Sequence, residues 1–174
     1  MRVLALGGIR SGKSAWAEAS FADAAEPVRY IATGAVGGSE PEWTARISAH
    51  RDRRPPHWST VETSDVTREL TSDRTTPTLV DDVGGWLVAA MDRRDAWTGG
   101  SIGDDAAALI DAVGAFAGPL AVVSPEVGLS VVPATASGRL FADALGELNQ
   151  NLAAVCDRVV LVIAGVPMIV KETS

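Results

Sequence analysis

The 174-residue sequence predicts an α/β fold, with a mostly parallel sheet covered by helices on both faces, of the P-loop NTPase class. Two observations support this prediction. Short runs rich in valine, leucine and isoleucine alternate with helical stretches, as they do in parallel sheets that are buried on both faces. The first of these runs leads directly into a G-x-x-x-x-G-K-S segment, which is the sequence form of a phosphate-binding loop.

The apolar runs define the expected strands, which lie in chain order at Arg2–Leu6, Val28–Ala32, His57–Val61, Thr78–Asp81, Leu120–Ser124 and Arg158–Ala164. A short edge strand near Met168–Val170 is weakened by Pro167, which has no backbone N–H to donate. The stretches between the strands are expected to be helical at Lys13–Ala24, Pro41–Arg51, Ser64–Thr71, Gly85–Arg93, Asp104–Phe116 and Gly138–Cys156. Asp104 and Asp105 suit the start of their helix, because acidic residues favour the first turn.

The bulk properties fit a single domain, residues 1–174, with a sizeable core. A net charge of −7 argues against a general nucleic-acid binder, which needs a broad basic face. The sequence shows no signal-peptide pattern and no run of about 18 apolar residues, so we expect a cytoplasmic protein without a membrane span. Cys156 is the only cysteine, and its apolar surroundings predict a buried thiol at a helix end rather than a catalytic one.

Three segments between the expected elements are interpreted as functional loops, namely Thr33–Ser39, Arg51–Pro56 and Pro125–Ser137. Ligands of open α/β sheets bind at the carboxyl ends of the strands. The expected strands would place these segments, or their neighbours, at that edge of the sheet.

The phosphate-binding loop consists of Gly7, Gly8, Ile9, Arg10, Ser11, Gly12, Lys13 and Ser14. Its glycines allow successive backbone N–H groups to turn inward around phosphates. Lys13 is expected to reach the β and γ phosphates, and the Ser14 hydroxyl to help hold Mg²⁺. Lysine occurs only twice in this chain, so a chance match at this position is improbable.

A carboxylate at the end of a neighbouring buried strand usually accompanies such a loop and orients Mg²⁺, directly or through water. The segment Thr78–Asp82 supplies this group, and Asp81 is preferred because it directly ends the apolar run. The alternative is that Asp81 and Asp82 form a helix-capping pair.

A focused basic patch follows from the segment 46–54, which holds four arginines around His50. Arginine binds phosphate oxygens through two parallel hydrogen bonds, and a neutral imidazole can attack phosphorus. His50 is therefore a candidate covalent nucleophile, with an exposed histidine at a helix end as the alternative. For His57, the other histidine, a packing role beside Trp58 is expected.

Several motifs, in this order, resemble the family of bifunctional adenosylcobinamide kinases/adenosylcobinamide-phosphate guanylyltransferases. They are Gly7–Ser14, Tyr30–Thr33, Arg46–His50, Arg54-Pro55 with Trp58, and Glu126–Gly128. The resemblance covers nearly the whole chain. The form G-G-x-R-S-G-K-S followed by R-I-x-x-H and E-V-G is much more specific than a phosphate-binding loop alone.

The resemblance implies a RecA-like domain with two activities. A nucleoside triphosphate would phosphorylate the aminopropanol hydroxyl of adenosylcobinamide. GTP would then guanylylate His50 with loss of pyrophosphate, and adenosylcobinamide phosphate would accept the GMP to give adenosylcobinamide-GDP. Mg²⁺ is the implied cofactor, with GTP and ATP as substrates, and the family also implies a homo-oligomer, typically a trimer.

The resemblance also implies site residues. His50 and Lys13 would be catalytic, and Ser14 and Asp81 would hold Mg²⁺. Besides the loop, the implied nucleotide contacts are Ala32, Thr33, Gly34, Arg51, Asp52, Arg53, Arg54, Glu62 and Asp81.

Four segments depart from the family pattern: Asp82 with Gly84-Gly85, Ser124-Pro125, Ala134–Ala136 and Gly165–Met168. They leave the phosphate-binding loop and the histidine segment intact, and Pro125 is expected to reshape the loop before Glu126 because it fixes its own φ.

Two other functions stay open. One is a P-loop kinase of small molecules that forms no histidine adduct. The other is a protein that senses GTP or ATP without turnover.

Overall fold

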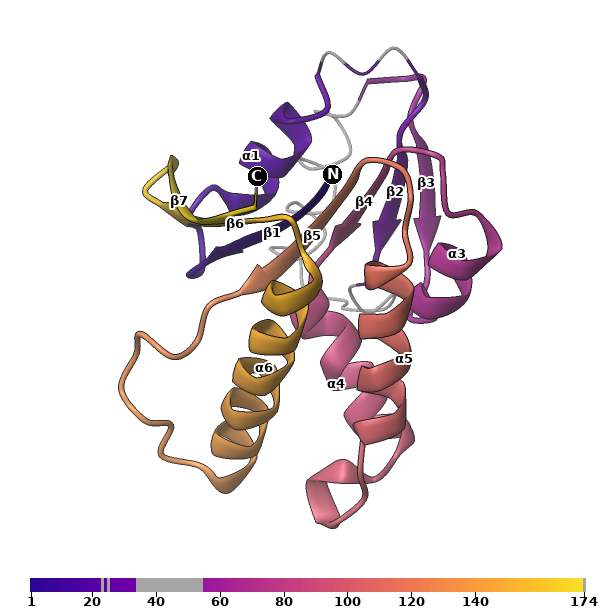
Figure 1. Ribbon diagram of the computed structural model, residues 1–174. Coiled ribbons are helices and arrows are strands. Elements are labelled where there is room, and N and C mark those ends of the chain that lie inside the picture. The colour runs from indigo at the N-terminus through magenta and orange to yellow at the C-terminus, as the bar shows by residue number, and fades with distance from the viewer. Residues whose placement is uncertain (23, 25, 34–54, 174) are drawn as a thin grey trace.

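The computed structural model describes residues 1–22, 24, 26–33 and 55–173, which build a seven-stranded sheet in the order β3-β2-β4-β5-β1-β6-β7 (Figure 1). Strands β1 to β6 are parallel, and β7 runs antiparallel to β6. The strands are β1 (Arg2–Gly7), β2 (Arg29–Ala32), β3 (Ser59–Glu62), β4 (Thr78–Asp81), β5 (Leu120–Pro125), β6 (Arg158–Ile163) and β7 (Val166–Glu172).

The helices of the described residues cover both faces of this sheet. They are α1 (Lys13–Ala19), α3 (Val66–Ser72), α4 (Val83–Arg93), the 3₁₀ helix η1 (Ala96–Thr98), α5 (Gly103–Gly114) and α6 (Ala136–Val155). Helix α1 packs on one face, and α3 to α6 contribute to the core on the other (Figure 1). This arrangement confirms the fold class that the alternating apolar runs predict.

Alternation along the strands divides the core between the two faces. In β5, Val122 faces the helices α3 to α6, whereas Ala121 and Val123 face α1. All three are almost completely buried. A central strand that is buried on both faces has a continuous apolar sequence, which is why these strands could be predicted.

The bounds of α1 and β3 differ from the prediction. Helix α1 ends at Ala19 instead of continuing to Ala24, because the next hydrogen bonds, such as Phe21 N–H to Glu18 O, tighten into 3₁₀ geometry. Strand β3 begins at Ser59, after a turn closed by Trp58 N–H and Pro55 O at 3.0 Å. The expected helix Pro41–Arg51 lies outside the described residues.

The turn also corrects the expectation for His57. This histidine is exposed in the turn and lies in neither a strand nor a packed position. Of these two neighbours, it is Trp58 that packs: its ring lies edge to face against Phe21, with ring centroids 6.3 Å apart. Proline is favoured at the second position of such turns, so Pro56 places its neighbour His57 at the surface.

The carboxyl-terminal edge strand is longer than expected. Strand β7 includes Pro167, which pairs with Val162 of β6. An edge strand tolerates proline because half of its N–H groups point away from the sheet. Ala164 and Gly165 form a two-residue hairpin turn in which both residues have positive φ, 51° and 80°.

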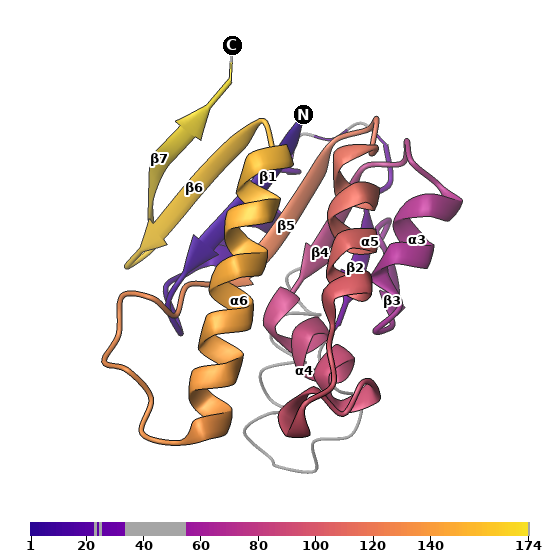
Figure 2. The same cartoon turned by 60° about the horizontal axis from the view of Figure 1, so that its bottom comes forward.

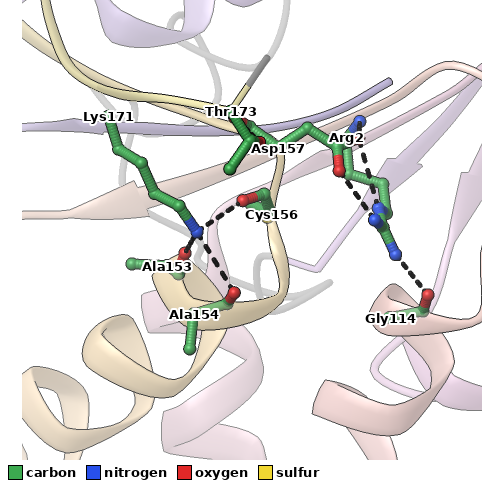
Figure 3. Close-up of polar contacts among 8 residues, drawn as sticks. All are labelled: Arg2, Gly114, Ala153, Ala154, Cys156, Asp157, Lys171 and Thr173. Carbon is green, nitrogen blue, oxygen red and sulfur yellow. Dashed lines mark hydrogen bonds and ion pairs between the residues drawn. The ribbon is translucent and has the colours of Figure 1, made fainter.

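Two basic side chains, Arg2 and Lys171, lie at the carboxyl ends of helices (Figure 3). Arg2 begins β1, the strand whose other end leads into the phosphate-binding loop. Lys171 Nζ donates to the carbonyls of Ala153, Ala154 and Cys156 at 2.7, 3.1 and 2.8 Å. Arg2 donates to Gly114 O at the end of α5 and to Asp157 Oδ1 at 2.7 Å. Cations are favourable at these positions because the last helical carbonyls carry partial negative charge.

Cys156 ends helix α6 and is buried, as expected. Burial raises the pKa of its thiol to about 12.

In the described part of the chain, no helix is both long enough and apolar enough to cross a membrane.

The Arg2–Asp157 pair predicts a pH-dependent stability. The hydrogen bond from Arg2 lowers the pKa of Asp157 to about 2, below the value of about 3.9 in an unfolded chain. Its contribution is therefore complete above about pH 4 and is lost as the pH falls to about 2. Since the Asp157 side chain is 34% exposed, we expect Asp157→Asn to cost only about 1 kcal/mol at pH 7.

Urea denaturation of the wild type and of Asp157→Asn between pH 2 and pH 7 measures this difference, which should shrink as the pH falls. Asp143→Asn, on an exposed position of α6, removes the same charge and serves as the control. An equal loss in both variants would contradict a specific role for the pair.

Candidate active site

The phosphate-binding loop connects β1 to α1 and has the conformation of an anion-binding loop. Arg10 and Gly12 have left-handed backbones, with φ of 56° and 91°. Ser11 N–H donates to Gly8 O at 3.2 Å, which closes the loop on itself. Gly8, Ile9 and Arg10 are exposed, whereas Ser11 is buried. Such alternation of backbone conformation turns N–H groups toward one concave side, where an anion can bind.

Gly7 can only be glycine at this position. A Cβ atom added to it would lie 2.4 Å from Ser11 Oγ and 2.7 Å from Val162 O. The loop therefore packs closely against both its own Ser11 and strand β6, which fixes where it leaves the sheet.

The structure brings the predicted magnesium residues together. Ser14 Oγ donates to Asp81 Oδ1 at 2.9 Å, and the hydroxyl of Tyr30 donates to Asp81 Oδ2. Lys13 Nζ donates to Gly8 O at 3.3 Å, so its ammonium lies over the loop. A hydroxyl and a carboxylate are the oxygen donors that Mg²⁺ prefers, and Mg²⁺ commonly keeps only one or two protein ligands beside phosphate oxygens and waters. The two side chains thus fit a magnesium ion.

Helix capping, the alternative for this acidic pair, is carried out by Asp82. Its carboxylate accepts a hydrogen bond from Gly85 N–H at 3.0 Å and caps α4. Asp82 has a left-handed backbone, with φ of 76°, and burial raises the pKa of its carboxyl group. Asp81 instead belongs to β4 and points toward Ser14.

Three further predicted residues lie at the same edge of the sheet. Asp81, Ala32 and Glu62 are in register across β4, β2 and β3. Thr33 N–H and Oγ1 both donate to Asp81 O, at 3.2 and 3.0 Å, so Thr33 ties the end of β2 to the end of β4. The remaining predicted residues, Gly34, His50 and Arg51–Arg54, lie outside the described residues.

Two of the expected departures from the family pattern, Gly84 and Pro125, contact each other. A Cβ atom on Gly84 would lie 2.9 Å from the ring of Pro125, so the proline occupies the space that this glycine leaves. Pro125 ends β5 beyond the last pairing of that strand with β4, and Glu126 N–H still donates to Gly7 O at 3.0 Å. The proline is thus accommodated in the strand, and the connection to the phosphate-binding loop is kept.

Sequence reasoning missed two residues that support the site. Tyr30 holds Asp81, and buried Asn149 of α6 accepts from Ser124 Oγ at 2.6 Å and donates to Pro125 O at 3.0 Å. An asparagine on the apolar face of a helix, between Leu145 and Leu152, was a signal for such a role, because buried amides need partners.

Comparison with known proteins identifies the family. The sequence matches the model of cobinamide kinase / cobinamide phosphate guanyltransferase over residues 3–170. This chain belongs to that family. It is 38% identical to the bifunctional adenosylcobalamin biosynthesis protein CobP of Pseudomonas aeruginosa, over 98% of both chains. It is 36% identical to CobU of Salmonella typhimurium, which has the same description, over 98% of this chain and the whole of that relative.

Among solved structures, the chain is similar to a prototypical ATPase from the type III secretion system of pathogenic bacteria, with a TM-score of 0.55 and 12% identity. The match covers 92% of this chain, which spans about half of the ATPase (50%). At this identity the likeness shows the fold alone, and it confirms the RecA-like P-loop fold of this cobinamide kinase family member.

The contrast between the two neighbouring aspartates predicts a sharp difference between matched variants. Asp81→Asn should lower Mg²⁺-dependent nucleoside triphosphate consumption by about two orders of magnitude or more, since it removes the charged oxygen beside Ser14. Asp82→Asn should change it little, because asparagine caps helices as well as aspartate and tolerates positive φ. Steady-state rates measured at several Mg²⁺ concentrations test this. Full turnover by Asp81→Asn would show that the magnesium assignment is wrong.

Proposed function

We propose that this chain is a bifunctional enzyme of adenosylcobalamin biosynthesis. It phosphorylates adenosylcobinamide with a nucleoside triphosphate and then transfers GMP from GTP to adenosylcobinamide phosphate, giving adenosylcobinamide-GDP. The observation that carries the proposal is the family match over residues 3–170, in a chain whose phosphate-binding loop faces a strand-end carboxylate. We also propose that residues 1–174 act as one domain.

In the kinase reaction, the aminopropanol hydroxyl of the corrinoid attacks the γ-phosphorus. The bond from the γ-phosphorus to the β-phosphate oxygen breaks, a nucleoside diphosphate leaves, and the proton of the hydroxyl is released. Lys13 and the backbone N–H groups of Gly7–Ser14 would bind the phosphates and stabilise the negative charge of the transition state. Ser14 and Asp81 would hold Mg²⁺, which neutralises phosphate charge when it is bound.

In the guanylyltransferase reaction, a neutral imidazole nitrogen of His50 attacks the α-phosphorus of GTP, and pyrophosphate leaves. A phosphate oxygen of adenosylcobinamide phosphate then attacks the same phosphorus and releases His50. This role of His50, and phosphate binding by Arg51, Arg53 and Arg54, is supported by the sequence motif and by the bifunctional description of the relatives. Gly34 and Asp52 are proposed as nucleotide contacts on the same basis, as are Ala32, Thr33 and Glu62.

The two histidines of the chain allow a matched test of guanylyl transfer. After incubation with Mg²⁺ and GTP, intact-protein mass spectrometry should show an addition of the mass of GMP in the wild type and in His57→Ala, and none in His50→Ala. The adduct should be acid-labile, because phosphoramidates are. An adduct that persists in His50→Ala would exclude this nucleophile. If no adduct forms in the wild type, phosphorylation of adenosylcobinamide is measured next. A plain kinase phosphorylates it, whereas a nucleotide sensor does not.

We also propose that copies of this chain associate through the hairpin of β6 and β7. Large apolar side chains are 53–66% exposed there, at Ile163, Val166, Met168, Ile169 and Val170. They lie on an edge strand whose outer backbone groups have no neighbouring strand in the sheet of the described residues. Monomeric proteins usually protect such edges with charge, so a second copy is the proposed cover.

The double variant Met168→Lys with Val170→Lys should therefore shift the protein from an oligomer toward a monomer. Light scattering coupled to size-exclusion chromatography would measure a dissociation constant raised by at least about tenfold, which corresponds to one or two lost apolar contacts. Val88→Lys, at an exposed apolar position of α4, is the control. A wild-type monomer, or an unchanged assembly in the double variant, would contradict the interface.

A further inference from the structure

The turn of the β6–β7 hairpin contacts the phosphate-binding loop. Gly165 N–H donates to Ser11 O at 2.7 Å. The backbones also lie close together here, since a Cβ atom added to Gly12 would be 3.1 Å from Gly165 Cα. Strand β6 is the direct neighbour of β1 in the sheet, so the turn is carried beside the strand that leads into the loop (Figure 2).

This contact determines how one peptide unit of the loop is oriented. The carbonyl of Ser11 and the N–H of Gly12 belong to the same peptide, and in a trans peptide they point in opposite directions. When Gly165 holds the carbonyl on the hairpin side, the Gly12 N–H must point to the other side. An N–H aimed away from the hairpin is available to a phosphate in the loop.

Other contacts of Ser11 do not replace this one. Its N–H bonds to Gly8 within the loop itself, and its buried hydroxyl has no hydrogen-bond partner among the described residues. Among the described residues, the bond from Gly165 is therefore the hydrogen bond that connects Ser11 to a different element. The geometry needs a residue with positive φ at position 165, where φ is 80°.

The hairpin is also anchored at its far end. Lys171 of β7 binds three carbonyls at the end of α6, and Thr173 N–H and Oγ1 donate to Asp157 O at 2.9 and 2.7 Å (Figure 3). Both ends of β7 are thus attached, one to a long helix and one to the phosphate-binding loop. An anchored hairpin can hold a loop in place, whereas a free one would move with it.

We propose that Gly165 is a positioning residue for phosphate binding, and that its backbone N–H holds the Ser11 carbonyl so that the Gly12 N–H faces the phosphate. The proposal rests on the proposed function, because it assumes that Gly7–Ser14 binds a nucleotide. It adds a residue of the carboxyl-terminal hairpin, in a segment that departs from the family pattern, to the nucleotide site.

Graded substitutions at position 165 test this role. A Cβ atom there meets no described atom within 4 Å, so a side chain strains the backbone without a clash among the described residues. Asparagine tolerates positive φ, alanine less, and a β-branched residue least. The affinity for a fluorescent GTP analogue with Mg²⁺ should fall in the order Asn, Ala, Val. We expect Gly165→Asn to stay within about twofold of the wild type and Gly165→Val to bind about tenfold more weakly.

Gly99→Val is the matched control, because Gly99 also has positive φ, 115°, and open space around it among the described residues, but follows η1 in the connection between α4 and α5. It should lower the melting temperature as Gly165→Val does and leave nucleotide affinity unchanged. Equal affinities of Gly165→Val and wild type, or an equal loss in Gly99→Val, would overturn the proposal. If Gly165→Val does not fold, the affinities of Gly165→Ala and Gly165→Asn for the GTP analogue are compared instead, and the proposal requires the alanine variant to bind more weakly. A wild type that binds no nucleotide would overturn the proposed function itself.

Discussion

The parallel pairing of β1 with β5 on one side and β6 on the other is the constraint on which the site depends. It places the end of β1, and so the start of the phosphate-binding loop, between two neighbours that both contact it. From the β5 side, Glu126 N–H binds Gly7 O. From the β6 side, Val162 O closes the space around Gly7, and Gly165 binds Ser11. A loop with many glycines has little rigidity of its own, so the contacts with the sheet are what hold it in one conformation.

The same sheet also brings the carboxylate to the loop. Asp81 ends β4, one strand beyond β5, and reaches Ser14 across the carboxyl edge. Tyr30 of β2 holds the side chain of Asp81, and Thr33, directly after β2, holds its backbone. The polar groups at this edge therefore support one another, and each depends on strands ending at the same level.

The residues at which the sequence is expected to depart from the family pattern are compatible with this arrangement. The ring of Pro125 occupies the space left by Gly84, and Asn149 binds the Pro125 carbonyl. The fold class, the strands and the Ser14–Asp81 pair could be predicted, because buried parallel strands have continuous apolar sequences and end at one edge. The sequence also left helix capping open as a role for the Asp81 and Asp82 pair, and Asp82 is the residue that caps α4. The exposure of His57 and the full length of β7 could not be predicted, because they depend on a local turn and on edge position. The contact between Gly165 and Ser11 depends on the strand order, which puts β6 beside β1, and no local pattern encodes it.

Cys156 has a practical consequence for experiments on this protein. It is the only cysteine, it is buried, and a thiol pKa of about 12 leaves almost no thiolate at neutral pH. Maleimide and iodoacetamide reagents react with the thiolate, so the folded protein should resist them without any substitution. A single cysteine introduced at an exposed loop position such as Ser130 would then be the one reactive thiol. A dye attached there could report movements of the loop between β5 and α6 in the otherwise unmodified enzyme.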